Sequence, residues 1–105
     1  MRMKMTLEQL TIFAEVAERQ HLTRAADALA LTPSAVSAAV RRLEEAYGVP
    51  LFDRIGRGIS TTAAGRIFLE EVRPVLARAR AAERVLGELG DLQSGEMSVF
   101  ASQTV

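Results

Sequence analysis

Hydroxyl and guanidinium side chains gather in one acid-free stretch of the chain. They are Thr32, Ser34, Ser37, Arg41 and Arg42. If this stretch is a helix, most of these groups lie on or near the face opposite Val36 and Val40. Hydroxyls and arginines on a protruding helix can hydrogen-bond to base edges and phosphates in a DNA major groove. The stretch therefore favours recognition of DNA. The alternative is an ordinary solvated helix face.

Two short helices joined by a tight turn are predicted to position these groups. Thr23 is the expected N-cap of the first helix, and Thr32 is the expected N-cap of the second, with Pro33 at its first position. The apolar stripe of the first helix is Ala25, Ala26 and Leu29. The second is expected to bury Val36, Ala39, Val40, Leu43 and Tyr47.

Small residues on the first helix allow the two helix axes to approach closely and cross steeply, as in a helix-turn-helix. Two alanine-rich helices joined by a turn also occur in helical bundles, so this stretch alone leaves both readings open. The turn Ala30-Leu31-Thr32 lacks the glycine that a left-handed residue favours. Alanine in that conformation costs about 1 kcal/mol.

An N-terminal helix precedes this pair. Thr6 and Gln9 match a capping box. The apolar stripe that follows is Leu7, Leu10, Phe13, Ala14, Val16 and Ala17. This stripe is expected to pack across the two short helices and complete a three-helix core.

A β-hairpin is predicted directly after the second short helix. Gly48 suits a helix C-cap, and Pro50 forces an extended exit. Residues 51–55 and 59–61 read as strands, with Arg57 between two glycines at the turn. An acid-free hairpin tip with Arg54 and Arg57 is compatible with a wing that reaches a minor groove, and equally with a solvated turn.

A long helix is predicted from a cap at Thr62 to about Leu89. Apolar residues recur along it at alternating steps of four and three, which favours dimerisation along a seam. The seam residues are Phe68, Val72, Val75, Ala79, Ala82, Leu86 and Leu89. If the long helix instead packs against its own domain, that contact accounts for residues 67–76 but hardly for the C-terminal end of the helix. Pro74 is expected to kink this helix locally.

The composition excludes several kinds of protein. Lys+Arg and Asp+Glu are 13 each, so any basic surface must be local. Cysteine is absent, which excludes disulfides and thiolate metal sites. His21 is the single histidine and lacks partners for catalysis, so we expect no enzyme, no cofactor and no metal. No signal peptide or membrane span is expected, and a cytoplasmic location is allowed.

In this order the elements resemble the N-terminal DNA-binding domain of LysR-type transcriptional regulators. The motifs that carry the resemblance span residues 5–90 and include Thr23-Arg-Ala-Ala26, Ser34-Ala-Val-Ser37, Leu43-Glu44, Leu51-Phe52-x-Arg54 and Thr62-Ala-Ala-Gly65. The implied fold is mainly α, a winged helix-turn-helix of three helices plus a β-hairpin wing, followed by a long dimerisation helix. The implied boundaries are 1–62 for the winged domain, 63–90 for the linker helix and 91–105 for a hinge and the first strand of an effector domain.

The resemblance implies a bacterial, cytoplasmic, sequence-specific regulator that binds a partly palindromic double-stranded operator as a homodimer, commonly within a tetramer. It places residues 33–47 in the major groove and the wing near the minor groove, and assigns a small-molecule effector to a C-terminal domain outside this chain. The residues expected at DNA are Thr23, Arg24, Thr32, Pro33, Ser34, Ser37, Ala38, Arg41, Arg42, Arg54, Arg57 and Thr62.

Two departures from the family pattern affect base reading. The family often has Gln and Pro where this chain has Pro33 and Ser34, and a long polar residue where it has Ala38. Specificity is therefore expected to depend more on DNA shape and thymine methyl contacts. Two alternatives stay open: the DNA-binding domain of a molybdate-type regulator, and a protein-interaction module that dimerises through the long helix without binding DNA.

Overall fold

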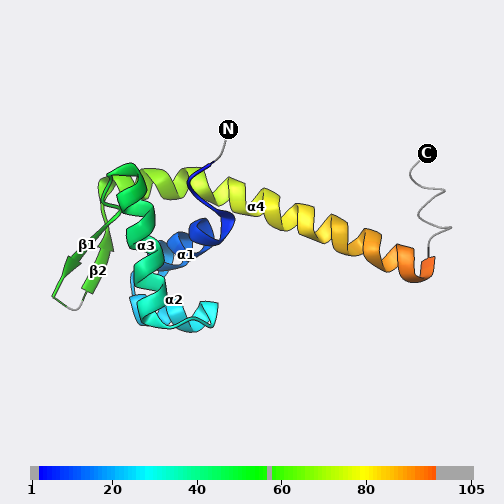
Figure 1. Ribbon diagram of the computed structural model, residues 1–105, viewed down its shortest axis with the longest axis horizontal. Coiled ribbons are helices and arrows are strands. Elements are labelled where there is room, and N and C mark those ends of the chain that lie inside the picture. The colour runs from blue at the N-terminus through cyan, green and yellow to red at the C-terminus, as the bar shows by residue number, and fades with distance from the viewer. Residues whose placement is uncertain (1–2, 57, 97–105) are drawn as a thin grey trace.

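A computed structural model of the chain describes residues 3–56 and 58–96. The described elements are α1 (Leu7–Arg19), α2 (Leu22–Leu29), α3 (Pro33–Tyr47), β1 (Phe52–Ile55), β2 (Gly58–Thr61), α4 (Ala63–Asp91) and a π-helical turn (Leu92–Glu96). The first three helices and the hairpin gather at one end of α4, whose remaining length projects away from them (Figure 1). This arrangement confirms the expected winged helix-turn-helix with a long following helix.

The core is centred on Phe13 of α1, which has no exposed surface. Its ring lies 5.5 Å from the ring of Phe52 in β1 and 4.9 Å from that of Phe68 in α4, both tilted. Such tilted ring contacts add to the hydrophobic gain of burying large rings. One side chain thus joins the wing and the long helix to the N-terminal helix.

Local signals set the ends of α1. The Thr6 hydroxyl accepts a hydrogen bond from the Gln9 backbone N–H at 3.1 Å, and the Gln9 side chain accepts one from the Thr6 N–H at 2.9 Å. The predicted capping box is therefore confirmed. Leu7, assigned to the apolar stripe, is exposed instead, and Ile12 is buried in addition to the predicted residues. Leu7 lies in the first turn, where no element of the described chain covers it.

The hairpin pairs β1 with β2 in antiparallel register, with Phe52 opposite Thr61 and Ile55 opposite Gly58. Phe52 and Thr61 at its base are buried, while the strands toward the turn are largely exposed. The predicted strands are confirmed to within a residue at each end. Arg57 lies outside the described residues.

Helix α4 begins at Thr62, as predicted, since the Thr62 hydroxyl accepts a hydrogen bond from the Gly65 N–H at 2.9 Å. It continues without a break through Pro74 and on to Asp91 (Figure 1). Gly87 and Gly90 both lie inside the helix, because flanking residues with good helix propensity outweigh single glycines.

The chain after α4 differs in part from expectation. A hinge and strand were expected from residue 91 onward, whereas Leu92–Glu96 continue as a helical turn with π geometry. The strand was expected over residues 95–102; residues 95 and 96 belong to this turn instead, and residues 97–102 lie outside the described residues.

Close packing at the start of α4 gives the first prediction. A Cβ on Gly65 would overlap the Leu51 carbonyl oxygen and lie 2.6 Å from Cγ2 of Thr61. Because backbone cannot yield as a flexible side chain does, Gly65→Ala should lower the free energy of unfolding by about 2 kcal/mol or more. Urea denaturation followed by circular dichroism measures this change.

Gly87→Ala is the matched control, because nothing lies within 4 Å of the added methyl. It should raise the free energy of unfolding, by up to about 1 kcal/mol, through helix propensity alone. Equal stability of Gly65→Ala and the parent would contradict the packing described here.

Candidate nucleic-acid interface

Helix α3 begins as its sequence predicted. The Thr32 hydroxyl accepts a hydrogen bond from the Ala35 backbone N–H at 3.1 Å, with Pro33 at the first helical position. Thr32 itself is exposed. Its hydroxyl hydrogen remains available to a further acceptor, because the cap uses only a lone pair of the oxygen.

Helix α2 begins two residues earlier than predicted, so Thr23 is not the N-cap. His21 takes that place, its Nδ1 accepting a hydrogen bond from the Arg24 N–H at 3.1 Å. An imidazole nitrogen supplies the acceptor that a threonine hydroxyl was expected to supply. This cap gives His21 a structural role, and the Thr23 side chain is left exposed.

Small residues bring α2 and α3 together. Ala25 and Ala26 of α2 have no exposed surface, and Val36 and Val40 of α3 are equally buried. The turn between the helices uses Ala30 in the left-handed region, with φ of 57°. The Leu31 N–H then donates to the Ala26 carbonyl at 2.9 Å, closing the end of α2. Ala30 therefore adopts the left-handed conformation that costs an alanine about 1 kcal/mol.

The outer face of α3 carries the predicted recognition residues. Ser34, Arg41 and Arg42 are exposed, while Ser37 and Ala38 are partly covered. Within the described part of the chain, the side chains of Ser34, Ser37 and Arg41 form no hydrogen bond or ion pair. Donors and acceptors without partners on an exposed helix face are free to meet base edges and phosphates.

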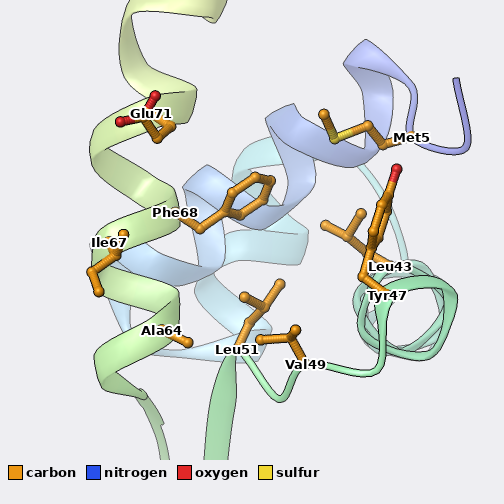
Figure 2. Close-up of a pocket in the computed structure, with 9 residues that line it drawn as sticks. All are labelled: Met5, Leu43, Tyr47, Val49, Leu51, Ala64, Ile67, Phe68 and Glu71. Carbon is orange, nitrogen blue, oxygen red and sulfur yellow. The ribbon is translucent and has the colours of Figure 1, made fainter.

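One prediction for α3 is wrong. Tyr47 was expected in the core, but 49% of its surface is exposed. It lies in the last turn of α3, beyond the part that α1 and α2 cover. Its ring instead forms a wall of a groove beside α4 (Figure 2).

The other predicted DNA-facing residues lie on several elements. Thr23 and Arg24 are exposed on α2, and Arg54 is exposed on β1. Thr62 is different, because its hydroxyl donates to the Pro50 carbonyl at 2.9 Å while it caps α4. The Thr62 hydroxyl therefore already bonds the segment that leads into the hairpin. The other predicted DNA-facing residues that the structure describes, on α2, α3 and β1, are exposed or partly exposed.

Glu44 fixes the wing relative to α3. A single carboxylate oxygen accepts hydrogen bonds from the Leu51 N–H at 2.7 Å and the Phe52 N–H at 3.2 Å, in partly buried surroundings. Charge-assisted bonds of this kind are stronger than neutral ones. The sequence marked Glu44 only through the family motif, and no local pattern predicted this contact.

The predicted dimerisation residues divide into two groups. Val72 is buried and Phe68 is partly covered within this chain's own core, so they are not simply free for a partner. Val75, Ala82 and Leu86 are exposed, with Leu86 at 70%. Packing back was expected to account for residues 67–76, yet Ile67 is 69% exposed. An apolar stripe therefore runs along α4 on a side that its own domain leaves open.

A groove of about 370 Å³ lies at the globular end of this stripe. Figure 2 shows Ala64, Ile67 and Phe68 of α4 on one side and Leu43, Tyr47, Val49 and Leu51 on the other, with Met5 above. Glu71 is the one charged residue of its lining. An exposed apolar groove continuous with an apolar helix face is typical of a protein–protein interface.

Comparison with known proteins identifies the family. The model of bacterial regulatory helix-turn-helix proteins of the lysR family matches residues 7–66. The chain belongs to this family. It is 42% identical over 99 residues to a RuBisCO operon transcriptional regulator of Acidithiobacillus ferrooxidans, covering 94% of this chain and 32% of the relative. The chain thus spans about a third of the length of that relative.

Solved structures agree with this assignment. The crystal structure of a CbnR_DBD–DNA complex is 36% identical, has a TM-score of 0.71, and covers 81% of this chain and 99% of the other. A BenM_DBD complex with benA site 1 DNA is 29% identical, with a TM-score of 0.73 and the same coverages. The chain therefore shares the fold of lysR-family DNA-binding domains, a winged helix-turn-helix followed by a long helix, as the motifs predicted.

Other kinds of site find no support in the described residues. No group of three or more His, Cys, Asp or Glu side chains is placed to hold a metal ion in residues 3–56 and 58–96. Among the helices of those same residues, not one combines the length and apolar character that a membrane span needs.

The Glu44 contacts give a second prediction. Glu44→Ala leaves two backbone N–H groups in a partly buried place without their acceptor, which should lower the free energy of unfolding by about 2 kcal/mol. Glu45→Ala removes a neighbouring exposed carboxylate and should change it by less than about 0.5 kcal/mol. Chemical denaturation of both variants measures the difference, and equal stabilities would refute the role assigned to Glu44.

Proposed function

We propose that this domain reads a partly symmetric double-stranded operator as a homodimer, with the N-terminal half of α3 in the major groove. The observation that carries the proposal is the set Ser34, Ser37 and Arg41 on the outer face of a helix-turn-helix, whose side chains are exposed or partly exposed and form no hydrogen bond or ion pair within the described residues. The DNA complexes of the similar domains support it, because those domains share this fold over most of the chain.

Readout on this face would depend on short side chains. Serine hydroxyls can meet any base edge, and the Pro33 ring and Ala38 methyl can pack on thymine methyls. Long bidentate side chains are missing at these positions. We therefore infer that local DNA shape contributes much of the specificity.

The wing and α2 would contact the DNA backbone. Arg54 and Arg57 of the hairpin, together with Thr23 and Arg24, can neutralise or hydrogen-bond to phosphates on either side of the groove. The net charge of the chain is zero. These local arginines would therefore supply the favourable electrostatic contribution to binding.

The whole regulator would extend beyond this domain. We place residues 1–62 in the DNA-binding unit, 63–90 in the linker helix, and 91–105 in a hinge leading to an effector-binding domain. A small-molecule effector would bind that further domain, in a cytoplasmic dimer or tetramer without enzyme activity. The family assignment supports this organisation, since the matched relatives are about three times as long.

The face of α3 gives the test of DNA reading. Ser34→Ala, Ser37→Ala and Arg41→Ala should each weaken binding to the cognate operator by about 1–3 kcal/mol, with a much smaller effect on scrambled DNA. Thermal stability should hardly change, because these side chains lie outside the buried core and form no hydrogen bond or ion pair within the described residues. Fluorescence anisotropy titrations on both DNA sequences, with a melting curve for each variant, measure these effects.

Val36→Asp is the contrasting control, because it puts a carboxylate into the fully buried α2–α3 contact and should unfold the motif. If all three face variants bind the cognate operator as the parent does, α3 is not the reading helix.

The stripe on α4 gives a separate test of dimerisation. Leu86→Glu places a charge in a seam that a partner would desolvate, so it should shift the chain to monomers. Ala77→Glu is the matched control, since Ala77 is exposed and lies nine residues from Leu86, about two and a half turns, on the opposite side of the helix from the stripe. Sedimentation velocity should show dimers for the parent and Ala77→Glu. Equal masses for the parent and Leu86→Glu would contradict this interface.

A further inference from the structure

The segment that leads from α3 into the wing gives all its backbone donors to one residue, Glu44. Residues 48–52 hold four N–H groups, because one of these five residues is a proline. The donors are those of Gly48, Val49, Leu51 and Phe52. The Glu44 carbonyl accepts the first two, the second of them at 3.1 Å. Its carboxylate accepts the last two, at 2.7 and 3.2 Å.

The carbonyl groups of the same segment bond to the start of α4 instead. The Pro50 carbonyl accepts the Thr62 hydroxyl at 2.9 Å, and the Leu51 carbonyl accepts the Thr62 N–H at 3.0 Å. The segment is therefore tied to α3 through its donors and to α4 through its acceptors. Because Thr62 is not part of α3, the bonds to Glu44 determine where the wing lies relative to the outer face of α3.

These bonds also determine the place of a wing arginine. Arg54 is exposed and lies two residues beyond Phe52 on β1, about 7 Å along the strand. Side chains two apart on a strand point to the same face, so the anchoring of Phe52 sets the direction of Arg54 as well. The Phe52 ring packs against Phe13 of α1, while its N–H is held by Glu44 of α3.

We propose that Glu44 is a positioning residue for DNA recognition, which joins α3 and the wing into one rigid unit. Arg54 and the outer face of α3 then contact neighbouring parts of the duplex at a fixed separation. This inference rests on the DNA reading proposed above and adds the residue that couples its two parts. Glu44 acts without touching DNA, because its carboxylate is engaged by backbone N–H groups and its charge would be repelled by phosphates.

A rigid unit makes binding depend on the shape of the duplex. A wing that tilts freely can follow the phosphates of any sequence, so Arg54 would add the same affinity everywhere. A wing fixed to α3 brings Arg54 to its phosphate only where the groove width matches the unit. Glu44 would thus supply a physical source for the shape-dependent specificity inferred from the short side chains of α3.

A purely stabilising Glu44 predicts a different result. Its loss would then lower the free energy of unfolding, but each DNA contact of the folded chain would keep its strength. The effects of substitutions at residues 44 and 54 on binding would multiply independently. Positioning instead requires that the contribution of Arg54 depend on the bonds of Glu44.

Two substitutions separate the hydrogen bonds of Glu44 from its charge. Glu44→Asp keeps the charge, but its side chain is one methylene shorter, which withdraws the carboxylate from both N–H groups. Glu44→Gln removes the charge and keeps an acceptor oxygen at the same reach. Glu45→Gln is the matched control, with the same charge change at an exposed neighbour. Circular dichroism at the titration temperature verifies that each variant is folded.

Each variant of the 105-residue chain is combined with Arg54→Ala and titrated against a fluorescent duplex that the parent selects from a random-sequence pool. In the parent, Glu44→Gln and Glu45→Gln, loss of Arg54 should weaken binding by about tenfold or more, as for a hydrogen bond to a charged group. In Glu44→Asp the same loss should be less than about threefold. The slope of log K against log salt should be shallower by about one per bound chain in Glu44→Asp, and unchanged in Glu44→Gln.

An equal effect of Arg54→Ala in all four backgrounds would overturn the positioning role and leave DNA reading by α3 intact. Glu44→Gln behaving as Glu44→Asp does would also overturn it, since the charge rather than the acceptor would then matter. No effect of Arg54→Ala in the parent would remove the wing from the DNA, and the inference would fail. A parent that enriches no sequence from the pool would refute the proposed function itself, and this inference with it.

A second measurement needs no variant of Glu44, and so does not depend on how well Glu44→Asp folds. Two duplexes share the sequence that α3 reads and differ only beneath the wing, where one has the narrow minor groove of an A-tract and the other is G·C-rich. A rigid unit predicts that the loss on Arg54→Ala differs between the duplexes by about threefold or more. Equal losses on both would indicate a wing that tilts freely, against the inference.

Discussion

The fold depends on the close approach of α4 to the segment that leaves α3. Gly65 lies against the Leu51 carbonyl where no side chain fits, and Thr62 both caps α4 and donates to Pro50. From the other side, Glu44 accepts the Leu51 N–H. A short stretch of backbone is thus hydrogen-bonded to α3 and to the start of α4 at once. The orientation of the wing follows from these contacts rather than from the hairpin's own pairing.

Because this junction holds α3 in place, the outer face of α3 is not needed to stabilise the fold. Ala25 and Ala26 allow a close helix crossing, and Val36 and Val40 fill it from α3. The hydrogen bonds that hold the motif come from cap residues and from Glu44 near the end of α3. The serines and arginines on the outer face therefore contribute little to stability, which leaves their side chains free to be chosen for DNA contact.

Local signals in the sequence were sufficient for the caps at Thr6, Thr32 and Thr62, because each cap involves residues three positions apart. The hairpin and the long helix followed from turn residues and periodicity for the same reason. The misplaced residues depend on distant packing. Periodicity shows which residues share a face, but it cannot show where the covering element ends, so Leu7 and Tyr47 were assigned to the core although both are exposed.

The exposure of the outer face of α3 was predicted from the sequence, but the contacts that support this helix were not. The contacts of Glu44 and the groove beside Tyr47 join parts of the chain that are remote in sequence, and no spacing rule brings them together. That groove also relates the two proposed activities. Leu43 and Tyr47 of α3 form one wall and α4 the other, so a partner helix in the groove would touch the element that carries the reading face. Dimerisation would then brace α3 against α4 and hold both reading helices at a fixed separation, which a symmetric operator requires.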